Sequence, residues 1–164
     1  MTLKYKFDDG GRDKYFEGNA GDCVVRSIAI ATNSDYKLIY DTLFNKAKDY
    51  INNHNNKISR RMNPSPRDGT NKVIYEEYLL TKGWKYISLI KFGSKDRTRI
   101  DQLTHLNNII IHVMPSHLVC MKKGIIHDNW DSRYSSCWDT EAMVVLDPVI
   151  KTAIGYFIKR KEEF

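Results

Sequence analysis

The chain has 164 residues, a length typical of one domain, and we expect residues 1–164 to fold as a single domain. Hydrophobic residues make up 41% and charged residues 28% of the sequence, which excludes a disordered or fibrous protein. The longest apolar runs, 109–114 and 143–146, are much shorter than the roughly 18 residues of a membrane span. Because the polar start of the chain also lacks the apolar stretch of a signal peptide, we expect a cytoplasmic protein with no membrane partner.

Lysine and arginine number 26 and aspartate and glutamate 20, so the formal net charge is +6. A basic balance is compatible with a polyanionic partner. The basic residues are nevertheless spread along the chain, and their densest groups, at 57–61, 95–99 and 159–161, are short. We therefore interpret them as a solvated surface and keep a basic nucleic-acid-binding module as an alternative function.

The first half of the sequence predicts helices. The first 17 residues are polar and aromatic, with a turn signal at 8–11, so regular structure is expected to begin at Cys23. An apolar run then predicts a buried helix that ends near Thr32-Asn33. Ser34 is the expected N-cap of the next helix. The remaining expected elements of this half are a helix at 35–52, a long loop at 52–70 and a helix at 71–82 that ends at Gly83.

The second half predicts strands, because the period of the apolar residues changes after Gly83. A turn signal at 122–124 predicts that 117–121 and 125–128 form a β-hairpin, and we also expect 142–146 to pair with 152–158. Helices followed by strands favour an α+β domain, with N-terminal helices packed on a C-terminal antiparallel sheet. The expected strands are 84–90, 108–114, 117–121, 125–128, 142–146 and 152–158, with a basic loop at 91–99 and a helical turn at 100–106.

Three cysteines, Cys23, Cys120 and Cys137, are too few and too far apart for a disulfide framework. The sequence contains no CxxC, HxxxH or HExxH pattern, so we expect no metal site and no cofactor. Cys120 follows an apolar strand pattern and is expected to be buried and inert. Cys137 lies in a polar segment, where we expect it to be exposed.

Cys23 lies where a glycine-rich turn, GNAGD at 18–22, leads into the first helix. The positive end of the helix dipole lowers the pKa of a thiol at this place and favours the thiolate. The glycines at 18 and 21 let backbone N–H groups approach a substrate oxygen. The sequence therefore makes Cys23 a candidate nucleophile, with a buried structural cysteine as the alternative.

His117 opens the first strand of the expected hairpin. With a two- or three-residue loop, we expect position 117 to lie opposite 128 or 129. Either Asp128 or Asn129 would then fix the tautomer of the imidazole and stabilise its charged form. A nucleophile at a helix start, a base on one strand and an orienting residue on the next form a Cys–His–Asp/Asn arrangement.

Three segments together resemble the papain-like cysteine hydrolase superfamily: GDCVVRSIAIAT (21–32), GTNKVIYEEYLLTKGW (69–84) and SHLVCMKKGIIHDNWDS (116–132). They are most similar to a group of small phage and bacterial proteins with a DCVVRAxAIAT-type helix start and a GHLxxxxxGxxHDTxD hairpin. The likeness covers most of residues 18–133. The C-x-x-R pattern that starts at Cys23 is also similar to that of OTU-type deubiquitinases, although Ala20 stands where those proteins place an aspartate.

The resemblance implies a papain-like fold and a role for each site residue. Cys23 would be the nucleophile, His117 the general base and then the general acid, and Asp128 the residue that orients the base. Asn129 and Asp131 are the alternative orienting residues. The oxyanion would be stabilised by Asn19 together with the backbone N–H of Cys23.

For three other residues the sequence allows two interpretations each. Arg26, one helical turn after Cys23, is either a surface cation or the partner of Asp22 or Asp128. Trp130 and Trp138 either line a substrate cleft or belong to the core.

The leading hypothesis for function is therefore a phage-associated cysteine hydrolase, a peptidase, isopeptidase or amidase, with a protein or peptide as its substrate and partner. Glu17 occupies the position where papain-like enzymes carry the glutamine of the oxyanion hole. An ionised Glu17 would repel an oxyanion, which motivates an inactive papain-like binding or structural protein as an alternative. The sequence indicates no oligomeric state.

Overall fold

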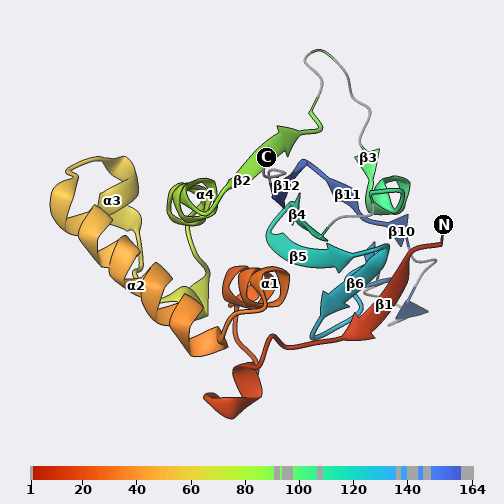
Figure 1. The fold of residues 1–164 in the computed structure, drawn as a ribbon, viewed down its shortest axis with the longest axis horizontal. Coiled ribbons are helices and arrows are strands. Elements are labelled where there is room, and N and C mark those ends of the chain that lie inside the picture. The colour runs from red at the N-terminus through yellow and green to blue at the C-terminus, as the bar shows by residue number, and fades with distance from the viewer. Residues whose placement is uncertain are drawn as a thin grey trace, which may run out of the picture.

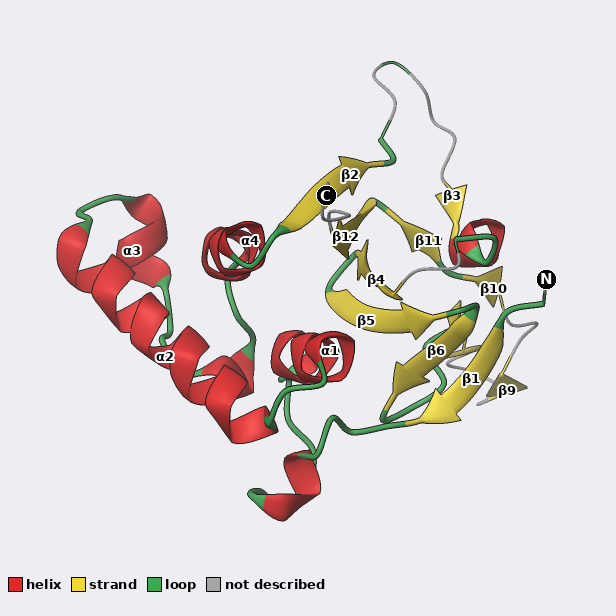
Figure 2. Cartoon of the chain, in the orientation of Figure 1, coloured by secondary structure: helices red, strands yellow, loops and turns green. Residues whose placement is uncertain are grey.

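Within the residues that the structure describes, four α-helices and a six-stranded mixed sheet build the α+β structure that the order of the sequence patterns predicts (Figure 1). The computed structural model describes residues 2–90, 93, 98–106, 109–135, 138–139, 144–145 and 149–159. Figure 2 shows most of the helices gathered on one side and the strands on the other. Among the described residues, none of the helices combines the length and the hydropathy that a bilayer crossing demands.

Helix α1 (Cys23–Thr32) has the bounds that the apolar run predicts. All of its residues from Val24 to Ala31 are buried, because α1 packs against β5 of the sheet on one side and against α2 on the other (Figure 1). The helix ends at Asn33, whose φ of 50° lies in the left-handed region that asparagine tolerates. The first residue of this central helix is the candidate nucleophile.

Helix α2 (Tyr36–Asn53) is also close to its predicted bounds, but its N-cap is Asp35 rather than Ser34. The Asp35 carboxylate accepts a hydrogen bond from the Leu38 N–H at 3.2 Å. The Ser34 hydroxyl accepts a hydrogen bond from the Thr32 hydroxyl instead, so it is not available to cap α2.

The expected loop at 52–70 is wrong in part, because it contains helix α3 (Lys57–Arg61) and the 3-10 helix η2 (Pro66–Asp68). A capping box between Asn56 and Ser59 stabilises α3, which is too short to show a helical period in the sequence. Helix α4 (Lys72–Thr81) follows, and Gly83 with its φ of 84° turns the chain into the sheet.

Strand β1 (Lys4–Phe7) corrects the expectation that regular structure begins at Cys23, and a short 3-10 helix, η1 (Arg12–Lys14), follows it. Strand β1 pairs in parallel with β6, so the sheet is mixed rather than antiparallel. Its sequence alternates lysine with Tyr5 and Phe7, as in a strand, but a run of four mostly exposed residues is too short to predict a strand by itself.

The six-stranded sheet has the order β1-β6-β5-β4-β12-β2, and all of its neighbours except β1 and β6 are antiparallel. The expected hairpin is present, with Lys123 and Gly124 as its turn and Lys122 opposite Ile125. A second tight turn, Pro115-Ser116, joins β4 to β5 and places His117 opposite Met114. The strands other than β1 are β2 (Trp84–Ser88), β4 (Ile109–Met114), β5 (His117–Lys122), β6 (Ile125–Asp128) and β12 (Gly155–Lys159).

The predicted pairing of 142–146 with 152–158 is wrong. Its described part, β9 (Val144–Val145), pairs with β8 (Trp138–Asp139), whereas β12 inserts between β2 and β4. The other two-stranded pairs are β3 (Thr98–Arg99) with β11 (Thr152–Ala153) and β7 (Tyr134–Ser135) with β10 (Val149–Ile150); the expected helical turn is η3 (Ile100–Leu103). Cys137 and parts of the 91–99 and 142–146 segments lie outside the described residues.

Two apolar clusters cover the two faces of the sheet. The larger joins α1, α2 and α4 to one face and includes Ile28, Leu43 and Phe157, each essentially inaccessible to solvent. The smaller lies on the other face around Ile110 and Met121. Burying each such side chain contributes about 1.5–3 kcal/mol, so the helix that carries Cys23 is firmly held against the strand that carries His117.

Candidate active site

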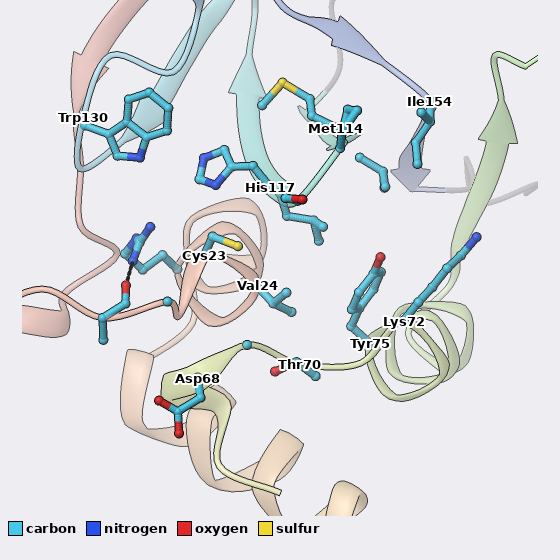
Figure 3. Close-up of a pocket in the computed structure, with 18 residues that line it drawn as sticks. Cys23, Val24, Asp68, Thr70, Lys72, Tyr75, Met114, His117, Trp130 and Ile154 are labelled. Carbon is cyan, nitrogen blue, oxygen red and sulfur yellow. Dashed lines mark hydrogen bonds between the residues drawn. The ribbon is translucent and has the colours of Figure 1, made fainter. Parts of the chain in front are cut away.

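Cys23 lies at the first position of α1 and lines a cavity of about 630 Å³ between the helices and the sheet (Figure 3). Gly21 lies beside the η2 segment, where a Cβ would be in ordinary van der Waals contact with the Arg67 carbonyl oxygen. The Cys23 side chain is half-buried and faces the cavity.

His117, the first residue of β5, lines the same cavity. The turn before it holds Ser116 at a φ of 59°, a left-handed conformation that is uncommon for a serine. This turn ends β4 and starts β5 beside the N-terminal end of α1, where the Leu118 carbonyl accepts a hydrogen bond from Ser27 of α1 at 2.9 Å. The expected base and nucleophile are thus brought together from opposite sides of one cavity.

Asp128, the last residue of β6, is buried, and its Oδ2 lies 2.6 Å from Nε2 of His117. The expected register is wrong, since the hairpin pairs Cys120 with His127 and its continuation places His117 opposite Trp130. Asp128 still reaches the imidazole because it is the diagonal neighbour on the adjacent strand. A hydrogen bond of 2.8 Å from the Asn129 N–H fixes the other carboxylate oxygen, Oδ1.

The pKa values of the two reacting groups shift in opposite directions. Burial raises the pKa of the Cys23 thiol, but interactions with His117 and the Leu118 backbone, together with the charge of Arg26, outweigh burial and lower it overall. Burial by itself lowers the pKa of His117, but the hydrogen bonds with Asp128 and Cys23 raise it to about 9. These directions favour a thiolate beside an imidazolium at neutral pH.

A chain of buried charges continues from Asp128 into α1. Arg26 Nη2 lies 3.6 Å from Asp128 Oδ1, and Nη1 of the same guanidinium donates a hydrogen bond to Asp22. Arg12 Nε also donates to Asp22 at 2.8 Å, and the hydroxyl of Tyr36 is a fourth member of the cluster. Arg26 is therefore not a surface cation, and it pairs with both of the candidates that the sequence suggests.

Four other residues that the sequence suggests lie outside the Cys23 cavity. Asp131 is held by Arg133, with Nη2 2.7 Å from Oδ2, rather than by His117. Asn19, Glu17 and Asn129 line a neighbouring cavity of about 320 Å³ instead of the Cys23 cavity. Neither the expected oxyanion donor Asn19 nor the carboxylate of Glu17 thus belongs to the cavity wall around the thiol.

Trp130 lines the Cys23 cavity and is 42% exposed, so it belongs to the cleft rather than to the core. Its ring centroid lies 5.3 Å from that of His117, and Nζ of Lys151 lies 4.4 Å above the indole ring. Trp138 is in β8, and its side chain is outside the described residues. Cys120 is buried in β5 as expected, and burial raises its pKa to about 12.

Sequence reasoning did not identify Arg12, Thr70 or Tyr75 as parts of the site. Arg12 lies ten residues before its partner Asp22, in a segment without a periodic pattern. Tyr75 and Thr70 come from the α4 region and line the cavity with Cys23. Tyr75 has a readable signal, since it lies next to Ile74 and one turn before Tyr78 and Leu79 on the buried face of the helix.

No protein-family model, curated protein or solved structure matches this chain.

Proposed function

We propose that the protein is a cysteine hydrolase on a papain-like fold that cleaves a peptide, isopeptide or other amide bond through a thioester on Cys23. The observation that carries the proposal is the 2.6 Å contact between His117 Nε2 and Asp128 Oδ2 beside a thiol of lowered pKa. The three side chains come from the start of α1, the start of β5 and the end of β6. Such a convergence of nucleophile, base and orienting carboxylate is the arrangement that nucleophilic catalysis requires.

In the first step, the Cys23 thiolate attacks the carbonyl carbon of the amide, and a tetrahedral intermediate forms. The imidazolium of His117 gives its proton to the leaving nitrogen, the carbon–nitrogen bond breaks, and the amine departs from a thioester on Cys23. In the second step, neutral His117 takes a proton from water, whose oxygen attacks the thioester. The carboxylic acid leaves, and the thiolate and imidazolium are restored. Asp128 holds the ring through Nε2, which leaves Nδ1 for these proton transfers.

The backbone N–H groups in the first turn of α1 are the donors for the oxyanion in this proposal. Asp22 occupies the N-cap position, but its side chain makes no capping bond in the described part of the chain, because its carboxylate binds Arg12 and Arg26. The N–H groups of this turn, including those of Val24 and Val25 that an N-cap side chain normally binds, thus carry no side-chain cap from the described residues. This replaces the expected contribution of Asn19, which lines the other cavity.

The test is labelling by a fluorescent chloroacetamide at pH 6 in a Cys137→Ala background, so that Cys23 and Cys120 are the remaining thiols. Cys23 should react much faster than glutathione, and Cys23→Ala should abolish labelling. Cys120→Ala is the matched control, because its buried thiol has a raised pKa and removing it should change nothing. Full labelling of Cys23→Ala, or a Cys23 pKa no lower than that of a free thiol, would contradict the hydrolase and favour an inactive papain-like binding protein.

A further inference from the structure

A buried tyrosine contributes a free hydroxyl to the candidate active site. Tyr75 of α4 is 6% exposed, its ring packs edge-on to Phe157 with centroids 6.2 Å apart, and it lines the Cys23 cavity. In Figure 3 its ring stands up from α4 with the hydroxyl inside the cavity. Among the described residues, no group forms a hydrogen bond with this hydroxyl. Burial, followed by the charges of Glu76, Tyr86 and Cys23, raises the pKa of Tyr75 to about 12, so the phenol stays protonated.

Thr70 supplies a second hydroxyl of the same kind. Its Oγ1 is buried and finds no partner in the described part of the chain, and the residue lines the same cavity. A buried hydroxyl without a partner costs about 1–3 kcal/mol, so native proteins rarely leave one like that of Thr70, whereas the Tyr75 hydroxyl is accessible from the cavity. Both hydroxyls are therefore candidates for hydrogen bonds with a substrate.

The rest of this end of the cavity is apolar or already paired. Val24, Val113 and Ile154 provide aliphatic walls. Lys72 lies at the rim, where its Nζ is 3.8 Å from Glu76 and 4.8 Å from the centroid of the Tyr86 ring. A charged group at the Tyr75 hydroxyl would lose hydration without gaining a buried counter-charge, whereas an uncharged polar group on an aliphatic stem would fit.

The position of His117 decides which part of the substrate reaches Tyr75. His117 protonates the leaving nitrogen, so the leaving group must lie on the imidazole side of the thiol, where the Trp130 ring lies tilted at 47° to the imidazole. Figure 3 shows Trp130 at one end of the cavity and Tyr75 at the other, with Cys23 and His117 between them. The acyl part of the substrate therefore extends toward Tyr75.

We propose that the Tyr75 hydroxyl recognises an uncharged polar side chain, of the carboxamide type that glutamine carries, on the acyl part of the substrate. This assignment rests on the proposed function, because the hydrolase mechanism defines the acyl side. The oxygen of a carboxamide accepts a hydrogen bond from the protonated phenol and brings no charge to this apolar end of the cavity. A methylene stem packs on the aliphatic walls.

The experiment measures binding without chemistry, in the full chain carrying Cys23→Ala. The ligands are acetylated tetrapeptide amides with glutamine, glutamate or norleucine at either of the two positions on the acyl side, and calorimetry gives their dissociation constants. We expect the glutamine peptide to bind most tightly. Tyr75→Phe should weaken glutamine binding about 3- to 10-fold and leave norleucine binding unchanged, as for the loss of one hydrogen bond.

Tyr78→Phe is the matched control, because Tyr78 is buried on the same helix but does not line the cavity. It should leave both affinities unchanged and shows whether loss of a buried phenol hydroxyl alone disturbs α4. An equal loss for glutamine and norleucine peptides would assign the hydroxyl to the peptide backbone and overturn the proposal. The proposal would also be overturned if the protein with Cys23→Ala alone bound the glutamine, glutamate and norleucine peptides with equal affinity, or bound none of them measurably.

The result of this binding experiment can be distinguished from the result of the Cys23 labelling that tests the proposed function. If Cys23 is labelled rapidly and Tyr75→Phe has no selective effect, the hydrolase stands and the role of Tyr75 is refuted. If Cys23 is inert and the glutamine peptide still binds through Tyr75, the cavity is a carboxamide-binding site and the hydrolase is refuted.

Discussion

The guanidinium of Arg26 lies 3.6 Å from the carboxylate of Asp128, Nη2 to Oδ1, with both side chains buried. This contact joins the orienting residue of the candidate triad to the first helix, because Arg26 also binds Asp22 at the start of α1. Charges of alternating sign thus follow one another from the Cys23 thiolate to the Asp22 carboxylate. The groups between them are the His117 imidazolium, the Asp128 carboxylate and the Arg26 guanidinium. Such a chain keeps buried charges paired at each step.

The first prediction concerns Asp22, the buried carboxylate at the end of this series of charges. Asp22→Ala leaves Arg12 and Arg26 without their common partner, and removing one member of a buried ion pair costs about 3–5 kcal/mol. We expect a loss of this size in the free energy of unfolding, measured by urea denaturation. Asp13→Ala, an exposed carboxylate in the same segment, is the control and should leave the midpoint almost unchanged. Equal midpoints for the two variants would show that the cluster contributes little.

The second prediction concerns pH. The Cys23 thiolate should persist well below the ordinary pKa of 9.0, so alkylation by iodoacetamide should remain fast in mildly acidic solution. His117→Ala removes the hydrogen bond and the charge of the imidazolium, which both lower the pKa of the thiol, so the midpoint of the alkylation profile should move upward. A midpoint that does not respond to His117→Ala would mean that the two groups are uncoupled.

The alkaline side of the turnover profile gives a third prediction. His117 has a raised pKa of about 9, so it carries its proton below that pH and loses it above. Because breakdown of the tetrahedral intermediate needs this proton, turnover of an amide substrate should fall as the pH passes about 9. Asp128→Ala removes the contact that raises the pKa, so the fall should begin at lower pH. An unchanged alkaline limb in Asp128→Ala would contradict the link between the two residues.

The fourth prediction separates the candidate orienting residues by turnover. Asp128→Ala should lower kcat roughly tenfold or more, because the imidazole loses the partner that fixes its tautomer. Asn129→Ala should have a much smaller effect, since its backbone N–H, not its side chain, contacts Asp128. Asp131→Ala should behave like the wild type, because that carboxylate pairs with Arg133. A larger loss in Asn129→Ala or Asp131→Ala than in Asp128→Ala would assign the orienting role elsewhere.

The fifth prediction tests the turn before His117. Ser116 is exposed and has a φ of 59°, a conformation that costs an L-residue about 1–2 kcal/mol and glycine much less. Glycine at this position would relieve the cost of the positive φ, but part of the stabilisation is lost because glycine makes the unfolded chain more flexible. Ser116→Gly should therefore raise the free energy of unfolding by about 0.5–1 kcal/mol, whereas Ser116→Ala keeps the strained φ and should not stabilise. Thermal unfolding of both variants provides the comparison.

The parts of the fold with a strong apolar period could be predicted from the sequence. Helix α1 and strands β4, β5 and β6 follow such patterns, and with them the approximate places of the three candidate triad residues. Strand β1 has a short alternation of lysine with Tyr5 and Phe7, but its parallel pairing with β6, a segment about 120 residues away, could not be predicted. Local pattern carries no information about such a long-range pairing.

The candidate site shows the same division. Cys23 and His117 are marked by their local surroundings, a glycine turn before a helix and the first residue of a strand. Asp128 was the expected partner, although the register that suggested it was wrong, because a diagonal contact across the strands bridges the difference. The environment of Arg26 and the cavity position of Tyr75 depend on how α1 and α4 pack, which spacing along the chain does not specify.

Strand β1 also makes the triad dependent on a short segment at the opposite end of the sequence. Phe7 pairs with Asp128 in the parallel register, and the Asp8 N–H donates to the Asp128 carbonyl at 2.8 Å. The N-terminal strand thus supports the end of β6 from which the Asp128 side chain projects. The same N-terminal segment belongs to the core, because Leu3 is buried in the smaller apolar cluster. Loss of residues 2–8 would therefore weaken both the position of this carboxylate and the packing on that face of the sheet.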